Sequence, residues 1–493
     1  MYIILINKLK SILKNKYIGA FICGLFSYIV ASSMLYPGHN WGGDFSQYIA
    51  QARALATGTV DLWYEKNSFI INHSCDGLGS HAYPWGFPIL LTPFYILFGA
   101  DIIVFKKIII ILFAASIFVL FIFYNEKMPI AETYIFTLLI GINPVYLAST
   151  DCVQSDIPCM FFSILAVYHI DRHLKLGKIQ NAICAGFFTF AAVQMRTMAL
   201  GILLALVCMD IFLLSDYFVH KMRGKKIFPD NIYFTYSWKK HIIPYMVFFG
   251  AQKVFDLFFV SAGETYLGYF TLDIMNIKEM VSKYIQCFQD VLGDFWILFV
   301  LFLIVGMFHC YKEEWYCVIY CTGMLVMLLI YEYYQGARFL FSIFPFIYLF
   351  VYYGVKILYS HWFSKYIRFG MFVALLLVLA SYMKNLYIND WLVRRSITWE
   401  IDAYSSDAME VYTYIDEKID DDKVIYFFKP RVLYLNTNNY SYTKEDSVEA
   451  MVKADYWLFW SNDFLVDCKD YALKNHSDKI IFQNNQFILF ENK

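Results

Sequence analysis

The stretch IIIILFAASIFVLFIFY, residues 108–124, decides the fold class of this chain. It contains no charged residue, no glycine and no proline, so nothing in it favours water or interrupts a helix. A helix rises about 1.5 Å per residue, and about 20 mainly apolar residues cross the hydrocarbon core of a bilayer. Similar runs recur at residues 17–36, 130–148, 157–173, 181–196, 198–215, 242–260, 293–310, 315–331, 339–356 and 367–383. The sequence therefore predicts an all-α polytopic membrane protein of about eleven transmembrane helices.

The composition supports this class. Of the 493 residues, 59% are hydrophobic and 16% are charged, whereas soluble domains carry about 25% charged residues. The net charge of −1 hides an asymmetry, because the segment from residue 384 onward holds 19 acidic and 13 basic residues. Lysine and arginine form no dense stripe that could neutralise a phosphate backbone, so a nucleic-acid partner is not expected.

The basic residues predict the orientation. With the N-terminus inside, the inner segments carry 18 Lys and Arg residues and the outer segments before residue 384 carry 8. Cytoplasmic loops are enriched in such residues. The bias predicts that the first long loop, residues 37–107, and the C-terminal segment lie on the exterior face. This placement needs an odd number of spans, and 242–260, which contains two charged residues, is the weakest of them.

Two domains are expected. Residues 1–383 form the membrane domain with its first exterior loop, and residues 384–493 form a small exterior α/β domain. In the second domain the pattern predicts a helix at 405–419. Strand-like runs separated by Asn, Asp and Lys turns follow at 424–428, 456–460, 479–482 and 486–490.

The first exterior loop contains the stretch GGDFSQYIAQARALATG, residues 42–58. Asp44 follows two glycines, and the helical segment after it ends at Gly58, a residue suited to a C-cap. Its carboxylate would lie at the membrane surface beside backbone that a ligand can approach closely. A structural role as a helix N-cap is the alternative, because Asp is favoured there.

A second acidic residue begins a later span. Asp156 stands two residues before Pro158, which suits the start of a helix. Its alternative role is again that of a cap. Asp151, in the same short exterior link, is a weaker candidate.

Three basic residues lie at membrane depth. Arg196 falls at an exterior junction between two predicted spans, and Arg338 opens a late one. Lys253 stands three residues before Asp256 on one face of the 242–260 span. An ionisable group inside a membrane costs about 2.5–3.5 kcal/mol on insertion scales, which favours a functional role. Alternatively, the arginines extend to the interface, and Lys253 and Asp256 pair with each other.

Together these residues indicate group transfer from a phosphate. An acceptor hydroxyl needs a base, which Asp44 could supply. A departing polyprenyl phosphate needs fixed positive charge, which Arg196 and Arg338 could supply. Tyr83 is a candidate for stacking on a sugar. No metal-binding spacing is present, no cofactor is indicated, and the residues leave open whether a divalent cation assists.

Four segments carry a resemblance to a known family. They are GGDFSQYIAQARALATG (42–58), YPWGFPILLTPFYILFG (83–99), SDIPCMFFSILAVY (155–168) and GARFLFSIFPFIYLF (336–350). Their order resembles that of the GT-C membrane glycosyltransferases, especially bacterial relatives of protein O-mannosyltransferases and the lipid A aminoarabinose transferase. The resemblance covers about residues 1–383. The second segment, rich in proline, is interpreted as an interfacial segment rather than a span.

The resemblance implies a function and a site. Asp44 would be the catalytic base, and Asp156 a second acidic residue that orients the acceptor or the base. Arg338 would contact the lipid phosphate, with Arg196 as a further candidate. Lys253 is a candidate for substrate binding from its position in an apolar run alone, not from the resemblance. Two departures stand out: Phe45 follows Asp44 where protein O-mannosyltransferases have a second acidic residue, and Phe339 replaces the usual Tyr. The first makes a protein acceptor doubtful.

The expected partners are a polyprenyl-phosphate-linked sugar donor, a glycan, lipid-linked or protein acceptor, and the lipid bilayer. The expected location is a bacterial inner or cell membrane, with the site on the exterior, periplasmic face. Two other functions stay open. A polysaccharide polymerase or ligase usually has a large late exterior loop, whereas the loop here, 332–338, is short. A transporter or flippase without chemistry is disfavoured by the odd span count and the globular tail.

Overall fold

The computed structural model describes residues 13–75, 83–223, 237–259, 270–293, 296–310, 312–361, 378, 380–382, 384 and 402–492. The chain divides into two compact units. The first comprises Met1–Met34, Ile108–Asp151 and Ser155–Trp391, and the second comprises Leu35–Lys107, Cys152–Gln154 and Leu392–Lys493. The first long loop thus groups with the C-terminal residues, whereas the sequence analysis had joined it to the membrane part.

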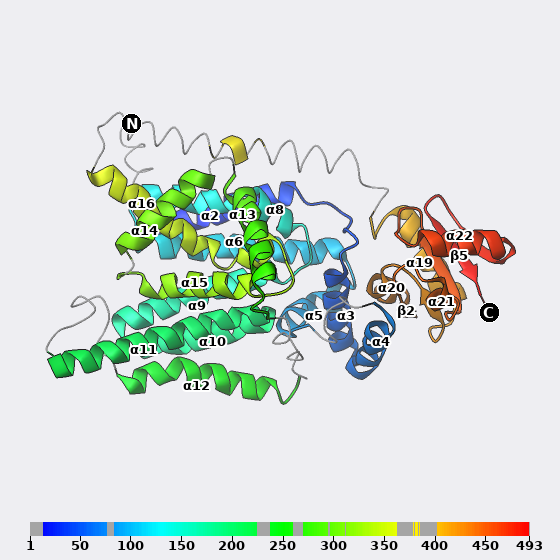
Figure 1. Ribbon diagram of the computed structural model, residues 1–493, viewed down its shortest axis with the longest axis horizontal. Coiled ribbons are helices and arrows are strands. Elements are labelled where there is room, and N and C mark those ends of the chain that lie inside the picture. Colours follow the sequence, from blue (N-terminus) through cyan, green and yellow to red (C-terminus); the bar gives the residue numbers. More distant parts are fainter. Residues whose placement is uncertain are drawn as a thin grey trace. The chain divides into compact units, whose positions relative to one another are not determined.

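The first unit is helical. Its elements are α2 (Lys16–Ser33), α6 (Ile102–Asn125, which starts in the second unit), α7 (Ile130–Gly141), α8 (Pro144–Thr150), α9 (Asp156–Leu176), α10 (Ile179–Met195), the 3₁₀ turn η1 (Thr197–Ala199), α11 (Leu200–Arg223), α12 (Trp238–Phe255), α13 (Ile274–Leu292), α14 (Trp296–Cys310), α15 (Trp315–Leu329), η4 (Ala337–Leu340) and α16 (Phe344–His361). Helices α9, α10 and α12 run side by side in Figure 1. The chain is a polytopic helical membrane protein with a small C-terminal sheet.

Helix length and composition identify fewer membrane spans than the sequence predicts. Three described helices are long and apolar enough to cross a membrane, or up to five if two bent helix pairs each count as one span. One such pair is α7 and α8, bent by 54° where Asn143 caps α8 and Pro144 begins it. The predicted span at 339–356 starts later, because residues 337–340 form a 3₁₀ turn and α16 begins at Phe344. The span at 367–383 lies mostly outside the described residues, so the count of eleven stays a prediction.

Close helix packing in the first unit depends on two glycines. A Cβ atom on Gly306 of α14 would meet the Phe350 carbonyl oxygen at 1.9 Å, and one on Gly354 of α16 would meet the Phe302 oxygen at 1.9 Å. Such distances cannot exist, so only glycine allows these backbones to touch. Membrane helices associate through small residues of this kind, because lipid offers no hydrophobic gain between helices.

A buried charged cluster joins three segments of the first unit. The Lys127 Nζ lies 2.7 Å from Glu314 Oε1 and 3.2 Å from Asp171 Oδ2. Lys175 approaches Asp171 at 2.8 Å and Glu314 at 3.2 Å. The side chains of Lys127 and Glu314 are only 5% and 3% exposed. Two cations and two anions therefore balance each other where α6 ends, α9 ends and α15 begins.

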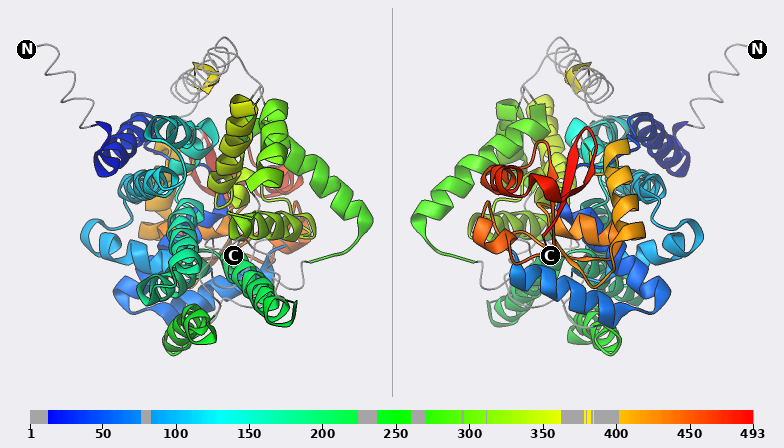
Figure 2. Two further views of the ribbon diagram at one scale, coloured as in Figure 1. Left: turned by 90° about the vertical axis from the view of Figure 1, so that its left-hand side faces the viewer. Right: turned by 90° about the vertical axis from the view of Figure 1, so that its right-hand side faces the viewer.

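The second unit combines the first loop with the C-terminal domain. The loop contributes α3 (Gly43–Thr57), α4 (Val60–His73) and α5 (Gly86–Phe98). The C-terminal elements are α19 (Ser406–Lys418), β1 (Val424–Tyr426), α20 (Pro430–Thr437), β2 (Tyr440–Tyr442), α21 (Val448–Met451), β3 (Tyr456–Trp460), α22 (Val466–Asn475), η6 (Ser477–Lys479), β4 (Ile480–Gln483) and β5 (Phe487–Glu491). The described strands form one sheet in the order β2-β1-β3-β5-β4, drawn in orange to red on the right of Figure 2.

Strands β1, β2 and β3 are parallel, and β5 is antiparallel to β3 and β4. The helix predicted at 405–419 is found as α19, and the four predicted strands correspond to β1, β3, β4 and β5. Five short described elements of this domain were not predicted: α20, β2, α21, α22 and η6. The predicted C-cap is confirmed, since Gly58 ends α3 with φ of +72°.

Candidate active site

Asp44 lies inside the first turn of α3. The N-cap of this helix is Gly42, which offers no side chain, so the interpretation of Asp44 as an N-cap is wrong. The Tyr83 hydroxyl instead donates a hydrogen bond to Asp44 Oδ1 at 2.9 Å. Two segments of the first loop, 42–58 and 83–99, thus meet at the carboxylate predicted to be the base.

A third residue joins this pair from the C-terminal domain. Arg431, in the first turn of α20, donates from Nη1 to the Tyr83 hydroxyl at 3.2 Å, and its guanidinium lies 5.4 Å from the centre of the Tyr83 ring. It is 4% exposed. Sequence analysis missed Arg431, because no pattern in its own segment relates it to residues almost 350 positions away.

The first unit holds the other acidic candidate. Asp156, in the first turn of α9, forms an ion pair with Arg196, the residue that ends α10. The N-cap of α9 is Ser155, so Asp156 is not the cap either. The Arg196 guanidinium also lies 4.3 Å from the centre of the Phe339 ring. Arg196 therefore contacts an anion and an aromatic face at once.

Arg338 is on the same ring. Its guanidinium lies 5.7 Å from the Phe339 centre, and its Nε donates to the Gln335 carbonyl oxygen at 3.2 Å. A small cavity of about 20 Å³ is lined by Asp156, Cys159, Arg196, Met198, Ala199, Met324, Arg338, Phe339 and Ser342. That volume holds about one water molecule. The structure thus brings Asp156, Arg196 and Arg338 together around Phe339.

The buried oxygen Asp156 Oδ2 accepts no hydrogen bond from the described residues. Asp156 is 3% exposed, and a buried carboxylate oxygen without a donor is costly. A polar group of a ligand in the cavity would satisfy it.

Lys253 is not among the residues that line the cavity with Asp156, Arg196 and Arg338. It is exposed near the end of α12 and forms no ion pair with Asp256 within the described chain, so the predicted pairing is wrong. Asp256 instead accepts from Gln252 Nε2 at 2.7 Å, and Gln252 Oε1 accepts from Gln194 at 2.7 Å. The role of Lys253 in substrate binding stays a prediction.

His39 connects the segment before Asp44 with the link 152–154. Its Nδ1 donates to the Asn40 carbonyl oxygen at 2.9 Å, and its Nε2 accepts from the Val153 backbone N–H at 3.1 Å. The ring lies 4.0 Å from the Phe45 ring. Burial lowers the pKa of His39 from 6.5 to about 3, so the ring is neutral when folded.

Because His39 is buried in its neutral form, we expect the folded protein to lose stability in acid. Its folded pKa lies below its unfolded value, so the stability it contributes is complete above pH 6.5 and is lost as the pH falls toward 3. We expect a loss of about 2 kcal/mol by pH 5, seen as a lower melting temperature in detergent. His39→Gln should flatten this dependence, whereas His73→Gln, at an exposed position on α4, should retain it. An unchanged acid slope in His39→Gln would contradict the prediction.

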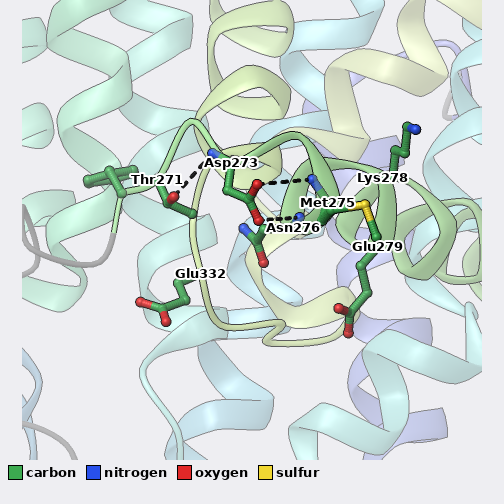
Figure 3. A pocket seen from close by; sticks show the side chains of 8 residues that line it. Thr271, Asp273, Met275, Asn276, Lys278, Glu279 and Glu332 are labelled. Carbon is green, nitrogen blue, oxygen red and sulfur yellow. Dashed lines mark hydrogen bonds between the residues drawn. The ribbon is translucent and has the colours of Figure 1, made fainter.

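A larger open hollow lies at the start of α13 (Figure 3). Its volume is about 850 Å³, and Asp273, Glu279 and Glu332 are among its lining residues. Asp273 is the N-cap of α13, because its carboxylate accepts from the backbone N–H groups of Met275 and Asn276. No group of three or more His, Cys, Asp or Glu side chains within the described ranges could hold a metal ion.

Comparisons with known proteins give a fold. No family model matches the chain, and no curated protein matches it by sequence. Among solved structures, ArnT from Cupriavidus metallidurans bound to undecaprenyl phosphate aligns with a TM-score of 0.59 at 9% identity, over 96% of this chain and 97% of ArnT. The oligosaccharyltransferase AglB from Archaeoglobus fulgidus, in complex with an inhibitory peptide and a dolichol-phosphate, aligns with a TM-score of 0.56 at 10% identity, over 92% of this chain and 70% of AglB.

Both proteins are GT-C glycosyltransferases. The alignments cover the membrane helices and the C-terminal domain together, since they include nearly the whole chain. This chain therefore has the fold of the GT-C membrane glycosyltransferases.

Proposed function

We propose that this protein is a glycosyltransferase of the cell membrane. It transfers a sugar from a polyprenyl-phosphate donor to a hydroxyl group of a glycan or lipid-linked acceptor on the exterior face. The GT-C fold supports the general kind of reaction, because the similar structures contain undecaprenyl phosphate and a dolichol-phosphate. The observation that carries the proposal is the hydrogen bond from Tyr83 to Asp44. The Asp44 carboxylate belongs to the segment that resembles the family's catalytic loop, and the tyrosine orients it.

In the proposed reaction, Asp44 takes the proton from the acceptor hydroxyl. The acceptor oxygen forms a bond to the anomeric carbon as the bond from that carbon to the phosphate oxygen breaks. A single displacement of this kind inverts the anomeric configuration. The polyprenyl phosphate leaves with the electron pair and needs no proton, only positive charge nearby.

Arg196 and Arg338 are suited to hold that phosphate. Arginine presents several N–H donors in a plane and binds phosphate oxygens through two bonds at once. The two guanidinium groups flank one ring and line one cavity with Asp156. Asp156 orients Arg196 through its ion pair, while its second oxygen is available to a polar group of the ligand. Fixed charge of this kind stabilises the leaving group without reorganisation during the reaction.

The test is a transfer assay with purified protein in lipid nanodiscs. Sugars linked to polyprenyl monophosphate and to polyprenyl diphosphate are supplied in parallel with a mixed acceptor pool. We expect transfer from the monophosphate donor, release of polyprenyl phosphate and an inverted linkage. Transfer from the diphosphate donor alone would indicate a polymerase or ligase. Movement of labelled lipid across vesicles without bond formation would indicate a transporter.

A further inference from the structure

We propose that Arg431 of the C-terminal domain is a positioning residue for Asp44 and acts through Tyr83. This role rests on the proposed function, in which Asp44 is the base. It gives the C-terminal domain a role in catalysis. The residues concerned, Asp44, Tyr83 and Arg431, all lie in the second unit.

The hydrogen-bond directions define the role. A tyrosine hydroxyl has a single hydrogen to donate. Arg431 has only N–H donors, so the Tyr83 oxygen must accept from it at 3.2 Å. The Tyr83 hydrogen is then directed to Asp44 Oδ1 at 2.9 Å. The charge on Arg431 also polarises the hydroxyl, which strengthens the bond to the carboxylate.

Burial makes direct contact between Arg431 and a substrate the weaker interpretation. The residue is 4% exposed, and its guanidinium lies over the Tyr83 ring. Tyr83 itself is partly exposed, as is Asp44. The buried arginine thus contacts the tyrosine, whereas the tyrosine and the carboxylate are the more accessible groups.

Helix α20, which presents Arg431, is fastened to α3, which presents Asp44. Pro430 occupies the first position of α20, where a fixed φ favours the helix. At the other end of α20, Arg53 of α3 donates to the carbonyl oxygens of Leu435 at 3.0 Å and Tyr434 at 3.4 Å. These are carbonyls of the last helical turn, and the Tyr434 oxygen also accepts from the backbone N–H of the C-cap residue Asn438 at 3.0 Å. Arg53 therefore holds the end of α20 against α3.

Two further contacts hold the loop against the C-terminal domain. Lys66 of α4 donates to the carbonyl oxygens of Asn438 and Asp421, and burial lowers the pKa of its ammonium group. Trp41, three residues before Asp44, packs 4.9 Å from the Phe428 ring and 5.4 Å from the Trp460 ring. The chain before Asp44 and the helix after it are thus both held by the C-terminal domain.

A double-mutant cycle tests the positioning role. The variants are Arg431→Gln, Tyr83→Phe and the pair together, assayed for transfer with the monophosphate donor. We expect Arg431→Gln to lower kcat about tenfold with KM for the donor unchanged, because misplacing a reacting group slows the chemical step. The double variant should be no slower than Tyr83→Phe alone, since Arg431 has no effect once the hydroxyl is gone. Arg431→Lys, which keeps both the positive charge and a donor for Tyr83, should recover part of the activity that the neutral Gln variant loses.

Two controls separate positioning from folding. Arg53→Gln removes hydrogen bonds between α3 and α20 but none to Tyr83. It should lower the melting temperature and leave kcat close to the wild-type value. Lys453→Gln removes an exposed charge of the same domain, where the side chain is 68% exposed, and should change neither. Additive effects of Arg431→Gln and Tyr83→Phe on kcat would overturn the role. So would a loss of kcat in Arg431→Gln that is fully accounted for by a lower melting temperature.

The outcome also distinguishes this role from the proposed function. A wild-type protein that transfers sugar while Arg431→Gln keeps its full kcat would overturn the positioning role alone. A wild-type protein that transfers no sugar from any donor would overturn the proposed function, and the positioning role with it.

Discussion

Asp44→Asn is expected to lower kcat for sugar transfer by about 10²–10⁴-fold, the range that a positioned general base contributes. The amide cannot take the acceptor proton at neutral pH. Its oxygen can still accept the hydrogen bond from Tyr83, so the local geometry is retained. The measurement is the initial rate of transfer in nanodiscs, with the melting temperature recorded for the same preparation.

Asp61→Asn is the matched control. Asp61 lies in the first turn of α4, as Asp44 lies in the first turn of α3, but it is exposed and contacts neither Tyr83 nor Arg431. Asp61→Asn, the same chemical change at this position, should leave the rate of sugar transfer unaltered. If Asp44→Asn retains activity close to that of the wild type, Asp44 is not the base. If both variants lose activity together, the loss comes from the loop rather than from the carboxylate.

Lys127→Met is expected to destabilise the protein by about 3–5 kcal/mol, the loss measured when one partner of a buried ion pair is removed. The variant would leave Asp171 and Glu314 with Lys175 as their remaining cation in a nearly dry cluster. Two carboxylates sharing one cation repel each other, and neither is compensated by water. Unfolding in mild detergent, followed as the loss of monodisperse protein on heating, measures the change.

Two variants make this prediction specific. Lys312→Met alters an exposed lysine in the segment that carries Glu314, and it should have little effect. The double variant Lys127→Met and Glu314→Met removes one cation and one anion, so the remaining pair, Lys175 and Asp171, stays neutral. We expect it to recover much of the lost stability, because apolar replacements of whole buried pairs are often tolerated. A double variant less stable than Lys127→Met would contradict this account.

Local patterns predicted much of the fold. Apolar runs became helices, as at 108–124 within α6, because a segment in lipid must satisfy its own backbone hydrogen bonds and a helix does so within itself. Strand-like runs between Asn, Asp and Lys turns predicted β3 and β5, and a glycine predicted the end of α3. The helix α20 was missed, since it has only eight residues and is stabilised by Arg53 from another segment.

The roles of Asp44 and Asp156 in catalysis stay predictions, and the sequence did not resolve their alternative role as helix caps. A carboxylate in a first helical turn and one at an N-cap differ by a residue or two, and helix boundaries are uncertain on that scale. The structure shows that Asp44 accepts from Tyr83 and that Asp156 pairs with Arg196. Lys253, chosen for its depth in an apolar run, lies at an exposed position near the end of α12.

The stretch at 108–124 and the similar apolar runs determine by themselves that this protein is helical and crosses a membrane. Burial of a helix in lipid depends on the composition and length of the segment. The tertiary structure alone decides which charges meet. Arg196 reaches Asp156 across 40 residues of chain, and Arg431 reaches Tyr83 across 348. Hydrogen bonds act over about 3 Å, and that proximity arises from the packing of whole helices, which no local pattern records.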